Sequence, residues 1–452
     1  MMDIDNKKSP VVIALDIGTT KICAIAGYRT EYGKIELLGV GKVKSEGVSR
    51  GVVSNIDKTV KAIKEAISIA EVNAGKKFKK VNVGIAGQHI KSLQHHGLVV
   101  RKDANSEISQ DDIDRLVNDM YKLVLPPGDK ILHVIPQEFT VDNEQHITDP
   151  IGMSGVRLEA NFHIITGQVT ASKNIFKVVE KSGLEVANLT LEPIASASSV
   201  LADEEKEAGV VLVDIGGGTT DITIFKDGII RHTAVIPFGG NVITTDIQEG
   251  LTVMKDQAEK LKVKFGSALA EEIVDNRLIV IPGFRGRDVK EISEKNLARV
   301  IQARIEEIFD FVEWEINRSG YKDKLLAGMV LTGGGSLLKD IDLLAELQTG
   351  INTRLGQPTE HLAHGYNEEL TSPIYSTGIG LLIHAIKQGN FSDDTEDIKR
   401  KTDKVEANNE ESFEEEIENN QTQENEKKTS KWLNKVFSYT KEFFESTPDS
   451  EF

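Results

Sequence analysis

Residues 211–225 read VLVDIGGGTTDITIF, which predicts an apolar strand, a turn of glycine and threonine, and a second strand of alternating apolar and polar residues. The glycines remove side chains from the turn, so backbone N–H groups can approach an anion closely. The threonines add hydroxyl donors, and Asp214 ends the first strand, where its carboxylate can hold a cation against that anion. The turn consists of Gly216, Gly217, Gly218, Thr219 and Thr220. We interpret the stretch as half of a clamp for nucleotide phosphates.

A second turn of the same design begins at Asp16, 198 residues before Asp214. Residues 11–15 form an apolar run, residues 16–21 read DIGTTK, and residues 22–27 form a second apolar run. Hairpins that are apolar on both faces are buried inside a sheet. Two such hairpins indicate a duplicated architecture with a ligand between its halves. Taken alone, DIGTTK is also compatible with an ordinary hairpin turn.

A third glycine turn follows the strand predicted at residues 326–331. It comprises Thr332, Gly333, Gly334, Gly335 and Ser336. The three glycines would let an adenine ring or a ribose lie against bare backbone, and a predicted helix begins directly afterwards. The chain contains no Walker sequence GxxxxGK[ST]. One glycine turn is a weak signal, but three at the ends of predicted strands point to a nucleotide site.

Composition limits the class of protein. The 452 residues suffice for two or more domains, and a net charge of -17 argues against nucleic acid as a main partner. Residues 393–426 hold 14 acidic and four basic residues, and residues 391–428 contain too few apolar residues to fold. The single cysteine, Cys23, excludes an internal disulfide and a cysteine zinc site. The polar start of the chain and the lack of a long apolar run favour a cytoplasmic protein.

Residues 88–165 differ in character from the segments around them. We expect short strands at 98–102 and 133–142 and a polar helix at 110–123, which together form a small inserted α+β subdomain. A strand at 161–166 is expected to return to the main fold. Three histidines cluster near this insert, at His89, His95 and His96, but no carboxylate spacing supports a metal site, so we expect them at the surface.

Taken together, these motifs resemble the superfamily of actin, sugar kinases and heat-shock chaperones. The resemblance covers residues 11–388 and rests on the three glycine turns and on the connecting helices at 192–197 and 377–382. Within it, the chain is most similar to the FtsA family of bacterial cell-division actin homologues. The similar segments are VNVGIAG at 81–87, HVIPQEF at 133–139 and DPIGMSG at 149–155, and the acidic tail ending in an amphipathic helix also fits.

The implied fold is α/β, a two-lobed actin-like fold with a small inserted α+β subdomain and a disordered acidic linker leading to a C-terminal amphipathic helix. The expected division is residues 1–87 and 164–200 for the first lobe, 88–163 for the inserted subdomain, 201–228 and 299–388 for the second lobe, 229–298 for a second-lobe insert, 389–429 for the linker and 430–446 for the helix.

The resemblance also implies roles for single residues. Asp16 and Asp214 would hold Mg2+ through water between the two halves. Contacts to the β- and γ-phosphates of ATP are implied for Gly18, Thr19, Thr20, Lys21, Gly216, Gly217, Gly218, Thr219 and Thr220, and contacts to adenosine for Gly333, Gly334, Gly335 and Ser336.

Three further residues have both an implied role and an ordinary alternative. Glu192 would orient the hydrolytic water, or it is an acid that merely complements a helix dipole. Glu259 and Lys262 would contact ribose and adenine, or they belong to a solvated helix face. The resemblance implies ATP binding with at most weak ATPase activity.

The end of the chain carries a separate signal. At about 100° per residue, the apolar side chains of residues 430–446 fall on one arc of roughly 140°, with lysines flanking it. Those side chains are Trp432, Leu433, Val436, Phe437, Phe443 and Phe444. A short aromatic amphipathic helix behind a polar linker is typical of an in-plane membrane anchor. A partner-binding helix, or a helix docked on its own domain, is the alternative.

These features predict an ATP-binding protein that polymerises on the cytoplasmic side of the membrane, as a peripheral protein at the division site. The resemblance implies that the lobe carrying 229–298 binds the C-terminal peptide of the tubulin-like protein FtsZ, and that the insert at 88–165 binds later division proteins. The pilus-assembly relative PilM and a sugar kinase share the cleft and remain alternatives. A heat-shock chaperone is disfavoured, because no long β-rich peptide-binding domain follows the cleft.

Overall fold

The computed structural model describes residues 10–101, 106–283, 289–363, 365, 368–389 and 396–397. The anchor predicted at 430–446 lies outside them, as does the linker at 389–429 except for residues 389 and 396–397, so both stay predictions. None of the described helices is both long and apolar enough to cross a bilayer.

Two five-stranded sheets of the same topology form the body of the molecule, with strand orders β12-β7-β1-β2-β3 and β15-β14-β13-β18-β19. In each sheet the central hairpin is antiparallel and the next two strands run parallel to its first strand. The duplicated architecture predicted from the two glycine turns is therefore confirmed.

The first sheet consists of β1 (Val12–Ile17), β2 (Lys21–Arg29), β3 (Ile35–Lys44), β7 (Lys80–Ile85) and β12 (Glu185–Leu191). The second consists of β13 (Val210–Ile215), β14 (Thr220–Lys226), β15 (Ile229–Ile236), β18 (Met329–Thr332) and β19 (Thr353–Leu355). Every residue of β1 and β13 is buried, as expected for strands covered on both faces.

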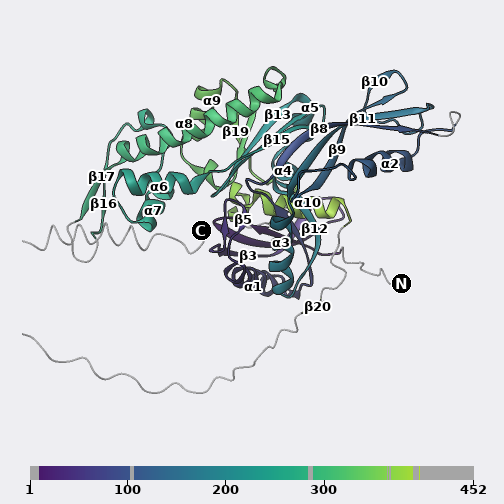
Figure 1. Cartoon of the computed structure of the whole chain (residues 1–452). Coiled ribbons are helices and arrows are strands. Elements are labelled where there is room, and N and C mark those ends of the chain that lie inside the picture. Colours follow the sequence, from purple (N-terminus) through teal and green to yellow (C-terminus); the bar gives the residue numbers. More distant parts are fainter. Residues whose placement is uncertain are drawn as a thin grey trace, which may run out of the picture.

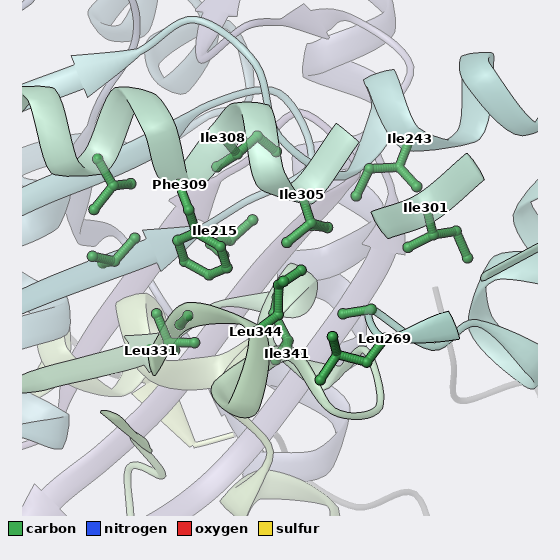
Figure 2. Close-up of a cluster of buried hydrophobic side chains, with 14 of the residues drawn as sticks. Ile215, Ile243, Leu269, Ile301, Ile305, Ile308, Phe309, Leu331, Ile341 and Leu344 are labelled. Carbon is green, nitrogen blue, oxygen red and sulfur yellow. The ribbon is translucent and has the colours of Figure 1, made fainter. Parts of the chain in front are cut away.

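Helices cover the outer face of each sheet. In the first lobe these are α1 (Ile56–Ala74) and α3 (Val169–Lys181). In the second lobe they are α6 (Gly240–Gly250), α7 (Lys255–Phe265), α8 (Glu294–Ser319) and α9 (Ile341–Thr349). Figure 2 shows Ile305 and Phe309 of α8 packed with Ile215 and Leu331, which belong to the sheet. The second-lobe core is thus a sheet face closed by a long amphipathic helix.

Two helices occupy the space between the lobes, α4 (Glu192–Val200) and α10 (Ser376–Lys387) (Figure 1). Helix α10 packs on β1, β2 and β7 of the first sheet, and α4 packs on β13 and β14 of the second. The two helices touch backbone to backbone, because a Cβ added to Gly380 would lie 1.8 Å from the carbonyl oxygen of Ala195. This contact joins the lobes.

The insert projects from the first lobe as a four-stranded sheet of order β10-β9-β11-β8 (Figure 1). Its elements are β8 (Lys91–Val100), α2 (Gln110–Met120), β9 (Asp129–Val141), β10 (Glu144–Ile147) and β11 (Arg157–Gln168). The strand expected at 161–166 does form, but the prediction that it returns to the main fold was wrong. It lies inside β11, which pairs with β8 and β9 over its whole length.

The insert also reaches the second lobe, at the edge strand β15. His163 Nε2 lies 3.0 Å from Thr233 Oγ1, and Ser92 Oγ donates to the carbonyl of Thr233 at 3.0 Å. Arg231 donates to Glu138 at 3.0 Å. Strand β15 pairs with β14 and belongs to the second main sheet, in contrast to the expected assignment of residues 229–236 to a second-lobe insert. The short strands β16 (Leu278–Ile281) and β17 (Lys290–Ser293) form the separate hairpin of that region.

The remaining described strands and α-helix are short. They are β4 (Val48–Ser49), β5 (Val52–Val53), β6 (Lys76–Lys77), α5 (Asp203–Ala208) and β20 (Glu396–Asp397).

The contact at Gly380 yields a test of the fold. Alanine has the higher helix propensity, by about 1 kcal/mol, yet its methyl group has no room against Ala195. We expect Gly380→Ala to lower the free energy of unfolding by about 2–3 kcal/mol in urea denaturation. Gly250→Ala is the matched control, because a Cβ there meets only Val300 at 3.5 Å. The control should be neutral or stabilising, and equal stability of the two variants would contradict the packing described.

Candidate functional site

The first glycine turn joins β1 to β2 at the inner end of the first sheet. Asp16 pairs across the hairpin with Cys23, so residues 18–20 form the loop. Lys21 forms an ion pair with Asp16, and both side chains are largely buried. Burial alone lowers the pKa of Lys21, but Asp16 and its neighbours outweigh this and raise it. The lysine is therefore charged at all physiological pH values.

The second glycine turn, between β13 and β14, lies directly against the first. A Cβ added to Gly217 would lie 2.2 Å from Thr20 Cγ2, and one added to Gly218 would lie 2.5 Å from Thr19 Oγ1. Glycine at these two positions is thus required for the close approach of the two turns. The turns that the sequence predicted to face each other come from different lobes and are in contact.

Behind the second turn stands a small polar network on α6 and α7. Lys262 Nζ donates to the carbonyl of Gly240 at 3.0 Å and to Glu259 at 2.8 Å. Thr244 also donates to Glu259. The N-terminus of α6 is in turn tied to the glycine turn, because Gly240 N donates to the carbonyl of Gly216 at 2.9 Å. Glu259 and Lys262 therefore adjoin the predicted site and are not a freely solvated helix face.

The third glycine turn follows β18, the neighbour of β13. Gly333 has φ +82°, and a Cβ there would lie 2.3 Å from Asp214 Oδ1. Residues Gly334–Leu337 then form a short 3-10 helix in place of the α-helix start that we expected. Ser336 is fully buried and its hydroxyl donates to the carbonyl of Gly333 at 2.8 Å. Its hydroxyl is therefore engaged with the turn itself, while a Cβ added to Gly334 would make ordinary contact with Ile374 Cγ1 at 3.8 Å.

Acidic side chains from both lobes gather where the turns meet. Burial, reinforced by Asp16, Asp221 and Asp214, raises the pKa of Glu192 well above its usual value. Burial, with Asp214 adding to it, raises the pKa of Asp221 to about 8. Burial also raises the pKa of Asp214, although Ser196 donates to it at 2.7 Å. The site gathers more carboxyl groups than Lys21 can balance if all were ionised, so a bound cation would favour their charged forms.

Several residues at the site were not singled out from the sequence. Asp221 faces Asp214 across the β13–β14 hairpin, and its Oδ1 atom is buried without a hydrogen-bond partner. The strand register could have revealed it, since the turn places both aspartates in one cross-strand pair. Ser196 and Thr377 approach Asp214 from α4 and α10, and only the tertiary fold brings them there.

Among the residues that the structure describes, no histidine contacts the glycine turns, and one prediction about histidines was wrong. His89 is buried rather than exposed, and neither of its ring nitrogens has a hydrogen-bond partner. Burial lowers its pKa, which favours the neutral ring. His96 is exposed, as expected, and pairs with Glu159 at 2.7 Å.

Two family models match the chain. "Cell division protein FtsA" matches residues 211–380, and "SHS2 domain inserted in FTSA" matches residues 87–166. The second match coincides with the projecting four-stranded sheet. The prediction of a small inserted subdomain is thus confirmed.

Three relatives of the same family name are similar in sequence over most of the chain. The Cell division protein FtsA of Pseudomonas aeruginosa is 43% identical over 378 residues, which cover 84% of this chain and 90% of that protein. The protein of the same name from Escherichia coli K12 is 35% identical over 402 residues, covering 87% and 94%. That from Bacillus subtilis is 35% identical over 379 residues, covering 84% of each.

Solved structures support the fold independently. The PilM-PilN type IV pilus biogenesis complex aligns with a TM-score of 0.60 at 15% identity, covering 83% of this chain and 98% of that one. MreB5 of Spiroplasma citri bound to ADP aligns with a TM-score of 0.50 at 16% identity, covering 84% and 97%. At such identities the likeness concerns the fold alone, which is actin-like. With the family models and the curated relatives, it follows that the chain belongs to the FtsA family of cell division proteins.

Proposed function

We propose that the protein binds ATP with Mg2+ between its lobes and uses the bound nucleotide to favour an assembly-competent arrangement of those lobes. The observation that carries the proposal is the contact of two glycine turns from different lobes. Beside them lies a cluster of buried carboxyl groups with only partial compensation by Lys21. Glycine turns offer backbone N–H groups to phosphates, and carboxylates favour a hard cation.

The residues present fit both groups. Asp221 Oδ1 is buried without a partner, and burial, reinforced by neighbouring carboxyl groups, raises the pKa values of Glu192 and Asp221. Lys21 only partly offsets this rise at Glu192. Within the described residues, no three His, Cys, Asp or Glu side chains are placed to hold one ion directly. A cation between Asp16 and Asp214 would therefore be held through water. Glycines and threonines at 18–20 and 216–220 would hold the phosphates, with Lys21 beside them.

Bound MgATP would supply the positive charge that the carboxylates lack and the negative charge that the glycine turns accept. Glu192 starts α4 and its side chain lies over Gly84 of β7, where a Cβ would approach Glu192 Oε1 to 3.0 Å. We assign Glu192 to orienting a water near the phosphates. Because burial and the neighbouring carboxyl groups raise its pKa, Glu192 holds a proton more readily than an exposed glutamate, and we propose at most weak hydrolysis.

The wider function that we propose is assembly at the division site. The chain would polymerise on the cytoplasmic side of the membrane through the helix at 430–446, and would tether FtsZ there by its C-terminal peptide. Membership of the FtsA family and the amphipathic pattern of the tail support this part. One such helix binds membranes weakly, so a polymer would multiply its hold by avidity.

Neutralising one carboxylate tests the cleft. Asp214→Asn keeps the size of the side chain but removes the charge that would face the cation. We expect the Kd for MgATP, measured by calorimetry, to rise at least about tenfold. Asp323→Asn is the matched control, because Asp323 is an exposed aspartate of the same lobe. Unchanged affinity in Asp214→Asn would sink the proposal of a cation-assisted nucleotide site.

The pKa of Asp221 gives a pH prediction. An unfolded aspartate titrates near pH 4, whereas Asp221 titrates at about 8 in the folded protein. Between these values the folded protein holds a proton that the unfolded chain releases, so stability falls as the pH rises.

We expect the free energy of unfolding, measured in urea without Mg2+ or nucleotide, to fall from about pH 5 to about pH 7. In Asp221→Asn this fall should be smaller by about 2–3 kcal/mol, since one proton corresponds to about 1.4 kcal/mol per pH unit over two pH units. Asp323→Asn should keep the wild-type slope. Identical slopes in all three proteins would mean that Asp221 ionises normally.

Sedimentation with liposomes tests the tether. The full chain should carry the FtsZ C-terminal peptide into the pellet with vesicles that contain anionic lipid. A variant lacking residues 430–452 should still bind the peptide in solution but leave it in the supernatant. Equal sedimentation of the two proteins would refute the anchor, and loss of peptide binding by the full chain would refute the FtsZ assignment.

A further inference from the structure

The two lobes are joined at a second place, away from the contact of α4 with α10. There, side chains of the insert donate hydrogen bonds to the backbone of the edge strand β15. Ser92 donates to the carbonyl of Thr233 at 3.0 Å, and Gln137 donates to the carbonyl of Ile230. We call this joint the clasp. It consists of Ser92, Gln94, Gln137, Glu138 and His163 of the insert, and of Ile230, Arg231 and Thr233 of β15.

The clasp is largely buried and consists of matched donors and acceptors. Arg231, which is 7% exposed, donates to Glu138 at 3.0 Å. Gln94 Nε2 lies 3.1 Å from His163 Nδ1, and because an amide nitrogen only donates, this ring nitrogen accepts. Burial lowers the pKa of His163 to about 4, so at neutral pH the ring carries its hydrogen on Nε2 and donates it to Thr233 Oγ1 at 3.0 Å. These pairs fix the placement of β15 against the insert.

The base of the insert is anchored in the first lobe by apolar packing. Ile90 and Ile165 are buried in the hydrophobic core of that lobe, and half-buried Ile135 packs on apolar side chains of both lobes. Leu191 N, at the end of β12, donates to His133 Nε2 at 3.2 Å. Domain interfaces that are mostly polar separate more readily than apolar ones. The clasp, rather than the base of the insert, is therefore the joint that opens when the lobes move.

A second joint limits how the lobes can rotate. Two bodies that touch at one place can turn about it in any direction, whereas two separate joints leave only the axis that passes through both. Any other rotation of the second lobe displaces β15 relative to the insert and breaks the clasp. The clasp also lies close along the chain to the nucleotide site, because Thr233 pairs with Thr223, two residues beyond Asp221 on β14.

We propose that the clasp restrains the movement of the lobes through which nucleotide leaves, so that breaking it speeds the release of ATP. The inference rests on the proposed ATP site between the lobes and adds a control of that site from outside it. An enclosed ligand leaves at a rate set by the opening of the domains around it. Because opening breaks buried hydrogen bonds of the clasp, the clasp raises the free energy of the open state. A ligand that pulled the insert from β15 would accelerate release without touching the nucleotide.

Removing two donors of the clasp tests the proposal. Ser92→Ala with Gln137→Ala leaves every residue of the glycine turns in place. Release is measured by stopped flow, as displacement of a ribose-labelled fluorescent ATP by excess MgATP. We expect the release rate to rise at least about fivefold, since each buried hydrogen bond changes an equilibrium by about that factor.

A milder variant keeps the test decisive if the double variant does not fold. Glu138→Gln preserves the size of the side chain and weakens the bond from Arg231, because a charged acceptor is replaced by a neutral one. The release rate should rise at least about twofold. Circular dichroism and urea denaturation check that each variant folds.

Ser182→Ala with Gln110→Ala is the matched control. Ser182 donates to the carbonyl of Val178 at 2.7 Å at the end of α3, and Gln110 donates to Asp114 at 2.8 Å within α2. The same residue types are changed, but each lost bond lies within one lobe or within the insert. Release from this variant should equal that from the wild-type protein.

Two results would overturn the proposal. One is release from the folded clasp variants at the wild-type rate, and the other is equal acceleration in the control. Failure of the wild-type protein to bind the labelled ATP would refute the nucleotide site itself, and this inference with it.

Discussion

The contact between α4 and α10 is the constraint on which the two-lobed structure depends. Each helix packs on the inner face of one sheet, and the two meet where Gly380 lies against the backbone of Ala195. Without a side chain at residue 380, the helices can approach to backbone contact. The distance between the sheets follows from that approach. Because each glycine turn extends from the end of a strand in one sheet, the separation of the sheets decides whether the turns can meet.

Bringing the turns together buries several carboxyl groups close to one another, which is electrostatically unfavourable. Asp16, Asp214 and Asp221 end up in one buried region with Glu192, and a single lysine offers positive charge to them. Burial, reinforced by the neighbouring carboxyl groups, raises the pKa values of Glu192 and Asp221 there. A protein that only needed a stable junction between lobes would gain from apolar residues there. Retained carboxyl groups at such a junction are typical of a site whose charge is completed by a ligand.

Much of this arrangement was predictable from the sequence, because the decisive signals are local. The apolar strands on either side of each glycine turn predicted both hairpins, and their similarity predicted two equivalent sheets. The wrong predictions concern strands that pair with segments far away in the sequence. Residues 161–166 look like any buried strand, and only pairing with β8 and β9 places them in the insert. Strand β19 is three residues long, too short for a periodic signal. His89 is polar in type yet buried by packing against Gly87 and Gly167.

The edge of the second sheet has a consequence for the order of folding. Strand β15 would expose unpaired backbone groups, which are a template for aggregation. The insert covers that edge, because Ser92 and Gln137 donate to the backbone carbonyls of Thr233 and Ile230. Synthesis proceeds from the N-terminus, so the insert at 87–168 leaves the ribosome some 60 residues before β15. The insert is therefore synthesised before the edge strand β15 that it covers. This order shortens the time for which the edge of the sheet would be exposed to other chains during synthesis.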